Sequence, residues 1–353
     1  MKPSHLPINK IRVGIIGAGQ NTRKIHLPKL LALPDVEIQE VANRTLQSAK
    51  ISAEEFHIPT VRKSWEEVAT SPDLDAIVIG TWPYLHCPAT CLALESGKHV
   101  LCEARMAMNQ AEAQKMLDTS RDRPDLVAQL VPAPFSLHAD KTIAEIIGCG
   151  DLGKILYFHV DYQSAPLATK QKTLHWRRNK NFSGMNIMTL GIIYESLLRW
   201  LPPAQWVKAE AKIFNDSAVD PETGETVAIE IPDYLSVQMG LQEGISGTFL
   251  ISEVGSHAGK PHIKIFGEKG TLALDFIPEG KIYFGRRDQT TLEEVPIPQN
   301  LRGAWKVEEE FINAIRNKIP FTHTSFSTGL EYMRFTEAAY RSYRNNGTRV
   351  PLA

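Results

Sequence analysis

Short apolar runs and longer amphipathic stretches alternate between residues 11 and 131. The apolar runs, rich in β-branched side chains, occupy positions 11–16, 36–42, 76–80, 99–102 and 126–131. Segments with a helical repeat of apolar positions separate them at 24–33, 46–56, 88–96 and 110–120. Runs this short suit strands that are buried on both faces of a sheet. The alternation therefore predicts a doubly wound parallel sheet covered by helices.

The pattern changes after Pro132. Alternating apolar and polar positions, typical of strands with one face in solvent, occur at 154–163, 207–214, 234–241, 246–251, 262–267, 271–276 and 281–285. Helical patterns occur at 137–147, 186–201, 304–317 and 327–344. Consecutive strands of this kind favour a large, mostly antiparallel open sheet. We expect an α/β protein with a first domain at 1–131 and a second, α/β domain at 132–353.

Composition narrows the class of protein. The chain has 353 residues, 43% hydrophobic and 22% charged, which is ample apolar material for two cores. A net charge of -1 without basic clusters argues against a nucleic-acid partner. The four cysteines lack the spacings of a zinc site or a disulfide framework, so we expect no metal and a reducing compartment. Without an export signal or an apolar run of about eighteen residues, we expect a cytoplasmic protein and no membrane partner.

A glycine-rich turn follows the first predicted strand. The sequence G-A-G-Q-N-T at 17–22 joins that strand to a helical pattern. Gly17 would permit a tight turn, and Gly19 would let the backbone approach a pyrophosphate group near the helix N-terminus. Gln20 and Asn21 complete the candidate turn, and Thr22 stands where a third small residue is usual. The turn predicts dinucleotide binding, with a purely structural turn as the alternative.

The end of the second predicted strand bears on the choice of dinucleotide. An acidic residue there would accept hydrogen bonds from the adenosine ribose of NAD. Asn43 occupies the position instead, followed by Arg44 and Thr45. With no carboxylate to repel a 2′-phosphate and a guanidinium to hold it, the sequence favours NADP over NAD. In the alternative interpretation Arg44 only stacks on adenine, which would serve either cofactor.

Four further segments carry a family resemblance. They are T-W-P-Y-L-H at 81–86, G-K-H-V-L-C-E at 97–103, L-L-R-W-L at 197–201 and F-G-E-K-G-T-L at 266–272. Together with the turn, they resemble the Gfo/Idh/MocA oxidoreductase family, named for glucose-fructose oxidoreductase and inositol dehydrogenase, over essentially the whole chain. The resemblance implies a Rossmann domain, an α/β domain with a large open sheet, and a sugar-like substrate lying between them. It also implies a homodimer or homotetramer formed through that sheet.

The resemblance also indicates further cofactor contacts. Its loop and strand motifs bring Thr81, Trp82, Pro83, His86 and Glu103 toward the dinucleotide. A tryptophan-arginine pair before the middle helix is common in the family, and Arg177 occupies the arginine position here.

The catalytic positions implied by the resemblance hold other residues. The family motif E-K-P is Glu103-Ala104-Arg105 here, so alanine replaces the lysine that contacts the substrate hydroxyl. In the middle helix the family places an aspartate, a histidine and a second aspartate, where this chain has Thr189, Ile193 and Ser196. Hydride transfer to or from a carbinol needs a proton carrier, worth ~10²- to 10⁴-fold in rate. Other residues must supply it if the chemistry is retained.

Five residues are candidates for the missing roles. Arg105 could restore the lost positive charge, although a guanidinium orients and stabilises rather than shuttling protons. Asn186 and Thr189 would share one face of the predicted helix and could hydrogen-bond sugar hydroxyls. Tyr194 and His175 are the nearest acid or base candidates, against the alternatives of a core tyrosine and an exposed histidine.

Three functions fit these observations. The first is an NAD(P)-dependent oxidoreductase acting on a sugar, cyclitol or related polyhydroxylated molecule. The second is a lyase or glycosidase-like enzyme that retains its cofactor and uses transient oxidation. The third is a non-catalytic dinucleotide-binding sensor or accessory protein.

Overall fold

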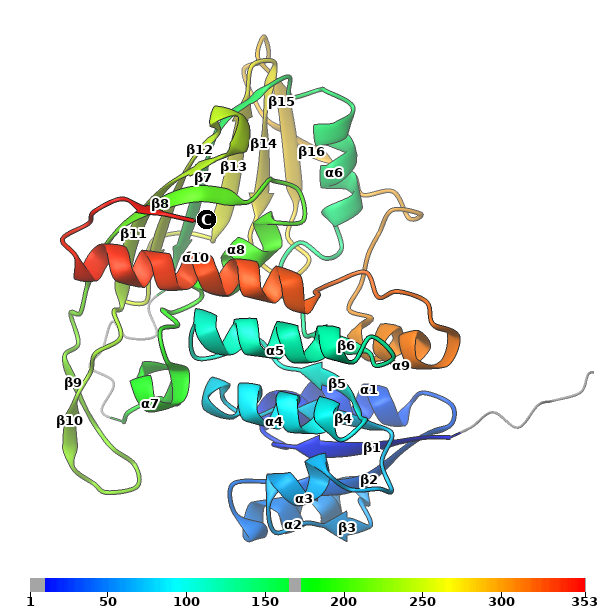
Figure 1. The fold of residues 1–353 in the computed structure, drawn as a ribbon. Coiled ribbons are helices and arrows are strands. Elements are labelled where there is room, and N and C mark those ends of the chain that lie inside the picture. Colours follow the sequence, from blue (N-terminus) through cyan, green and yellow to red (C-terminus); the bar gives the residue numbers. More distant parts are fainter. Residues whose placement is uncertain (1–9, 165–172, 353) are drawn as a thin grey trace, which may run out of the picture. The chain divides into compact units, whose positions relative to one another are not determined.

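The computed structural model describes residues 10–164 and 173–352, which divide into two compact units (Figure 1). The first unit contains the described residues up to Pro132 together with Lys306–Leu330. The second contains Ala133–Trp305 and the described residues from Glu331 onward. Lys306–Leu330 thus groups with the first unit, although the expected boundaries place it in the second domain, 132–353. Helix α9 (Val307–Asn317) contacts α1 (Leu27–Leu31) there.

The first unit is built on a parallel sheet of six strands in the order β3-β2-β1-β4-β5-β6. Its strands are β1 (Ile11–Ile16), β2 (Val36–Ala42), β3 (Thr60–Val61), β4 (Ala76–Ile79), β5 (His99–Cys102) and β6 (Ala128–Leu130). Strand β4 is buried along its whole length, as a sheet covered on both faces requires. The predicted doubly wound fold is confirmed; the bounds of the five predicted strands differ by two residues at most, and β3 was not predicted.

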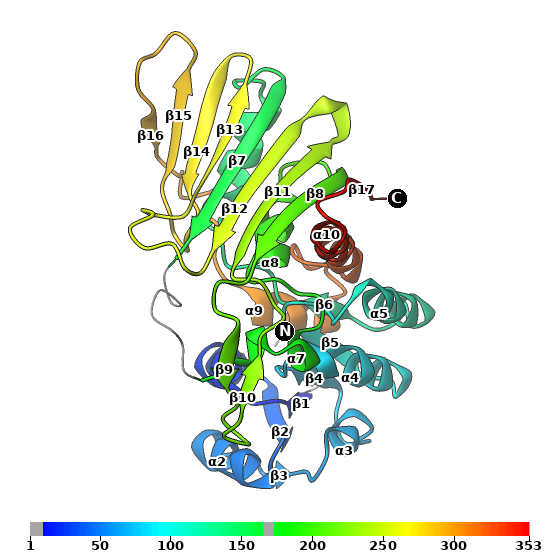
Figure 2. The same cartoon turned by 90° about the vertical axis from the view of Figure 1, so that its left-hand side faces the viewer.

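Helices cover both faces of this sheet (Figure 2). They are a π-helical turn η1 (Thr22–His26) leading into α1, then α2 (Leu46–Phe56), α3 (Trp65–Ala69), α4 (Pro83–Glu95), α5 (Gln110–Asp122) and α9. The side chains of Thr45, Ser64 and Asn109 accept hydrogen bonds from first-turn amides and fix where α2, α3 and α5 begin. Helix α4 begins five residues earlier than its apolar pattern predicts, because Pro83 is well tolerated at the first helical position.

The second unit is built on a nine-stranded sheet in the order β16-β15-β14-β13-β7-β12-β11-β8-β17 (Figure 2). Its strands are β7 (Ile155–Gln163), β8 (Ala204–Lys212), β11 (Tyr234–Leu241), β12 (Ser246–Ser252), β13 (His262–Gly267), β14 (Gly270–Asp275), β15 (Ile282–Arg286), β16 (Glu293–Val295) and β17 (Val350–Pro351). All neighbours are antiparallel except β7 and β12. The predicted mostly antiparallel sheet is confirmed.

Helices α8 (Leu190–Leu197) and α10 (Phe326–Arg344) pack together on the second unit. The ring of Tyr194 stacks on that of Phe335 with 3.9 Å between centroids, and Phe335 also meets Phe249 of β12. Helix α6 (Asp140–Gly148), the short α7 (Lys180–Ser183) and the ribbon of β9 (Ser217–Val219) and β10 (Thr226–Ala228) complete the unit. Part of the apolar core of this unit therefore lies between α8, α10 and β12.

Candidate functional site

The glycine-rich turn has the geometry that a phosphate-binding turn needs. Gly17 has φ +88°, and a Cβ added there would lie 2.5 Å from Thr81 Cγ2, so the position is closed to other residues. Gly19 is exposed and its Cβ would meet only the Gly80 carbonyl oxygen, at 3.6 Å. A side chain at residue 19 would therefore fit the protein while occupying the space beside the turn.

Thr22 stands at the third position of the motif, where a small residue is usual, and its side chain contacts the turn directly. Its hydroxyl donates to the Gly17 carbonyl oxygen at 3.0 Å, and the residue is 1% exposed. A Cβ on Gly80 would lie 2.0 Å from Thr22 Oγ1. The close approach of helix and strand thus depends on glycine at residue 80, which leaves room for a threonine on the helix.

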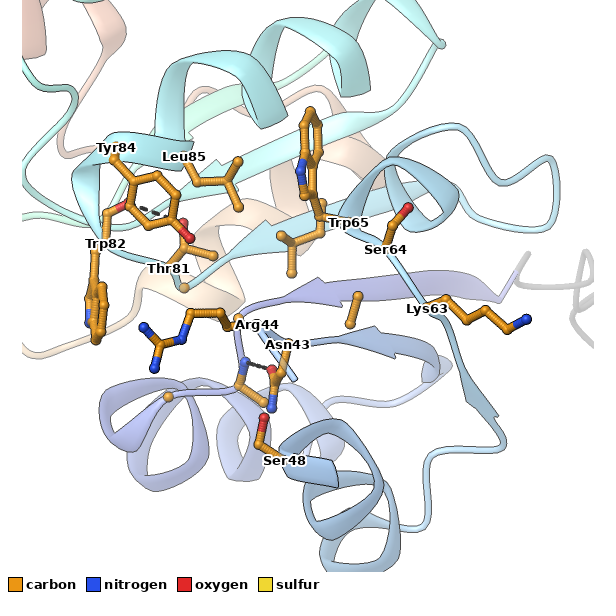
Figure 3. A pocket seen from close by; sticks show the side chains of 16 residues that line it. Asn43, Arg44, Ser48, Lys63, Ser64, Trp65, Thr81, Trp82, Tyr84 and Leu85 are labelled. Atoms are coloured by element: carbon orange, nitrogen blue, oxygen red, sulfur yellow. Dashed lines mark hydrogen bonds between the residues drawn. The ribbon is translucent and has the colours of Figure 1, made fainter. Parts of the chain in front are cut away.

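A cavity of about 480 Å³ opens beside this turn, entirely within the first unit (Figure 3). Six of the sixteen lining residues were expected from the sequence: Gly17, Gly19, Asn43, Arg44, Thr81 and Trp82. The other ten were not predicted as cofactor contacts; they include Ser48, Lys63, Ser64, Trp65, Tyr84 and Leu85. A usable signal existed for Ser64, since it is the N-cap of a helix that follows strand β3, and ligands of doubly wound sheets gather at such strand ends.

Asn43 and Arg44 lie on one wall of the cavity (Figure 3). Asn43 Oδ1 accepts a hydrogen bond from the Ala18 amide at 2.7 Å, so this side chain holds the glycine-rich turn. The Arg44 guanidinium lies over the ring of Trp82, 5.5 Å from its centroid. Among the sixteen lining residues are the cations Arg44 and Lys63, and none is Asp or Glu. The wall therefore suits an anionic ligand group.

His86 holds two loops together behind the cavity. The imidazole is fully buried, with Nδ1 2.8 Å from the Arg105 carbonyl oxygen and Nε2 3.0 Å from that of Thr81. Burial lowers the pKa of His86. The neutral ring carries one N–H and donates to one carbonyl at a time. His86 thus joins the end of β4 to the residues after β5 and is not among the lining residues of the cavity.

Glu103 links the same region to the glycine-rich turn. It accepts hydrogen bonds from Asn21 Nδ2, from the Ala104 amide at 3.1 Å and from His26 Nε2 at 2.9 Å. His26 Nδ1 lies 2.6 Å from Glu308 Oε1 of α9. Burial alone would lower the pKa of His26, but hydrogen bonds and charge from the two carboxylates outweigh it and raise the pKa to about 9. His26 is therefore an imidazolium between two carboxylates.

The remaining residues predicted to contact the cofactor do not line the cavity. Gln20 is exposed at the start of the helix, and Pro83 is buried in the first turn of α4. Arg177 belongs to the second unit, where its guanidinium lies over the Trp176 ring, 4.3 Å from the centroid. None of the three lines the cavity of the first unit.

Arg105 lies three residues after the end of β5 and is buried, with 4% of its surface exposed. The peptide bond between Ala104 and Arg105 is cis. The residue thus places a permanent positive charge beyond the carboxyl end of a parallel strand, the edge at which doubly wound sheets bind ligands.

The helix predicted for the middle segment of the second unit is shorter than expected. A single helix was predicted for 186–201, but α8 spans only Leu190–Leu197. Gly184 and Met188 have φ values of +64° and +44°, which interrupt a right-handed helix before it starts. Asn186 lies in this loop, where its Nδ2 donates to the Ser183 carbonyl oxygen at 2.7 Å. Asn186 and Thr189 therefore do not share a helix face. Thr189 Oγ1 is buried and has no hydrogen-bond partner among the described residues.

Tyr194 belongs to the core of the second unit. The residue is 2% exposed, and its hydroxyl accepts a hydrogen bond from the Ala204 amide at 2.7 Å. Burial raises its pKa. With its ring stacked on Phe335 and its oxygen bonded to the backbone, Tyr194 is a core tyrosine, and the prediction that it carries a proton to a ligand is wrong.

His175 lies on an exposed turn of the second unit. Its Nδ1 accepts a hydrogen bond from the Arg177 amide at 3.3 Å, capping a short 3-10 turn. Partial burial, and then the charge of Arg177, lower its pKa, so the ring is neutral near pH 7 with its proton on Nε2. Of the two acid or base candidates, His175 is the one whose side chain is exposed.

Two further observations concern the described residues, 10–164 and 173–352. They contain no group of three or more His, Cys, Asp or Glu side chains that could hold a metal ion. No helix in this part of the chain is long and apolar enough to span a membrane.

A doubly wound sheet with this turn and cavity is typical of NAD-binding Rossmann proteins, and two family models extend that conclusion to the whole chain. The model described as "Oxidoreductase family, NAD-binding Rossmann fold" matches residues 11–129. The model of the same family's C-terminal alpha/beta domain matches residues 144–352. The chain belongs to the Gfo/Idh/MocA oxidoreductase family, as its sequence motifs indicated.

Named relatives support this membership. The trans-1,2-dihydrobenzene-1,2-diol dehydrogenase of Mus musculus is 31% identical over 248 residues, covering 69% of this chain and 68% of the mouse protein. The scyllo-inositol 2-dehydrogenase (NADP(+)) of Bacillus subtilis is 24% identical, covering 93% and 96% of the two chains. Among solved structures, the apo form of levoglucosan dehydrogenase aligns with a TM-score of 0.85 at 19% identity, covering 98% and 99%. This last likeness concerns the fold alone.

Proposed function

We propose that the protein is an NAD(P)-dependent oxidoreductase that acts on a sugar, cyclitol or related polyhydroxylated small molecule. The observation that carries the proposal is the 480 Å³ cavity beside a turn that only glycine can form at residue 17. Two relatives named above act on a diol and on an inositol, which supports the substrate class. A homodimer or homotetramer formed through the nine-stranded sheet stays a prediction. Light scattering of the purified chain measures the number of subunits.

The cavity residues fit a dinucleotide. The open space at Gly19 and the backbone amides of the turn would take the pyrophosphate, and Arg44 with Asn43 would favour the 2′-phosphate of NADP. When bound, the nicotinamide ring supplies a hydride donor or acceptor. Arg105 would stabilise negative charge on a substrate oxygen. Thr189 and Asn186 stay predicted ligands of substrate hydroxyls, and His175 the predicted proton carrier.

Replacing Arg44 with alanine should weaken NADP binding by ~1.5 to 3 kcal/mol, because a charge-assisted contact to the 2′-phosphate is lost. NAD, which lacks this phosphate, should bind the variant about as well as it binds the wild type. Isothermal titration with both cofactors at two salt concentrations measures the difference. Equal losses for NADP and NAD would mean that Arg44 stacks on adenine.

The proposed reaction is tested by a screen of sugars, cyclitols and their keto forms with both cofactors. We expect turnover of at least one compound, and Arg105→Ala should lower kcat about 100-fold or more while cofactor affinity changes little. Arg105→Lys, which keeps a charge, should retain part of the activity, and His175→Gln should flatten the pH profile. A protein that binds the dinucleotide but turns over nothing would be a sensor or accessory protein. Product formation without net cofactor consumption would indicate transient oxidation.

A further inference from the structure

We propose that Trp82 is a positioning residue for cofactor choice: its indole face holds the Arg44 guanidinium at the cavity wall, ready to receive a 2′-phosphate. The inference rests on the proposed function, because it concerns the same cavity. Both side chains line that cavity, and the guanidinium carbon lies 5.5 Å from the indole centroid. Figure 3 shows the Arg44 side chain extended toward the Trp82 ring.

Trp82 has a firmly held backbone. It is the N-cap residue of α4 in an extended conformation, with φ -88° and ψ 159°, and Pro83 follows at the first helical position. The carbonyl before it, on Thr81, lies 3.0 Å from the buried His86 ring. The Tyr84 ring stands beside the indole, 6.5 Å between centroids. These contacts hold in place the indole ring over which the Arg44 guanidinium lies.

Arg44, in contrast, is an exposed residue between β2 and the N-cap of α2. A long, exposed side chain loses rotamer freedom when it binds a ligand. The contact with Trp82 restricts that freedom before the ligand arrives. A cation above an aromatic ring is also attracted electrostatically, and a guanidinium held in this way can meet a phosphate with charge-assisted hydrogen bonds.

The consequence differs between the two dinucleotides. A phosphate carries charge that a pre-positioned guanidinium can bind, whereas the corresponding ribose hydroxyl of NAD is neutral. Trp82 should therefore strengthen NADP binding through Arg44 and leave NAD binding nearly unchanged. If the indole instead stacked on the bound cofactor itself, it would serve NADP and NAD equally.

Isothermal titration of NADP and NAD tests this difference. Trp82→Ala should weaken NADP about 2- to 5-fold, the range expected for an exposed cation–π contact, and NAD less than 2-fold. Trp82→Phe, which keeps an aromatic face, should restore part of the NADP affinity. In an Arg44→Ala background, Trp82→Ala should no longer change the ratio of the two affinities. Trp65→Ala is the matched control, since this indole lines the cavity on another wall and should not alter the ratio.

Three results would overturn the inference. An equal loss for both cofactors in Trp82→Ala would mean that the ring contacts the cofactor directly. An unchanged NADP affinity in both Trp82 variants would mean that Trp82 does not act through Arg44. The same conclusion would follow if Trp82→Ala still lowered the ratio of NADP to NAD affinity in the Arg44→Ala background. A wild-type protein that binds neither dinucleotide would instead contradict the proposed function, so the two failures are distinguishable.

Discussion

A Gly19→Val variant should lose dinucleotide binding and remain folded. The Cβ at residue 19 meets only the Gly80 carbonyl oxygen, at 3.6 Å, and φ is not in the positive region, so the backbone accepts a side chain. The added methyl groups would project into the space where the pyrophosphate must approach the turn. We expect the dissociation constants for NADPH and NADH to rise about 100-fold or more, as measured by isothermal titration.

Gly17 supplies the contrasting variant. Its φ of +88° and the 2.5 Å contact that a Cβ would make with Thr81 predict that Gly17→Ala destabilises the first unit. Circular dichroism and thermal unfolding separate the two effects, because only the residue 17 variant should unfold at lower temperature. Unchanged cofactor affinity in a folded Gly19→Val protein would mean that the turn does not hold a pyrophosphate.

The first unit should lose stability as the pH rises from 6.5 through about 9. His26 has an ordinary pKa of 6.5 and a folded-state pKa of about 9, raised by Glu103 and Glu308 against the effect of burial. Its contribution to the free energy of unfolding is complete below pH 6.5 and disappears as the pH passes the folded-state value. The loss should reach ~3 kcal/mol. Urea unfolding, monitored by hydrogen exchange in the peptides of β1 and β5, measures this loss of stability.

Glu103 produces the opposite dependence at acid pH. Burial by itself would raise the pKa of its carboxyl group, but the hydrogen bonds from His26 and Asn21 and the charge of His26 together outweigh that effect and lower it. Its contribution is present above the ordinary pKa of a glutamate and is lost as the pH falls through the folded-state value. We therefore expect maximal stability between these two transitions.

Two variants test the assignment to His26. His26→Gln should remove the alkaline transition and should lower stability at pH values below that transition, where the two carboxylates lose their counter-charge. Glu308→Gln leaves one carboxylate beside the ring, so the transition should move toward lower pH. An alkaline transition of the same size in His26→Gln would place its origin elsewhere.

Local patterns identified the doubly wound sheet and most of its strands. Strands β1 and β2 have the predicted bounds, and α2 does as well, because strong apolar periodicity and a capping Thr45 fix them locally. The same reasoning was wrong for 186–201. The apolar pattern there suits a helix, yet positive φ values at Gly184 and Met188 keep the chain out of it until Leu190.

The sequence by itself determined the two sheets, the turn at Gly17 and Gly19 and the family, since each depends on spacing within a short segment. Only the tertiary structure showed that Tyr194 is a core residue, because its stacking partner Phe335 is far along the chain. The pairing of His26 with Glu308, 282 positions apart, was equally hidden. Such contacts depend on how separate segments pack, and periodicity along one segment carries no information about them.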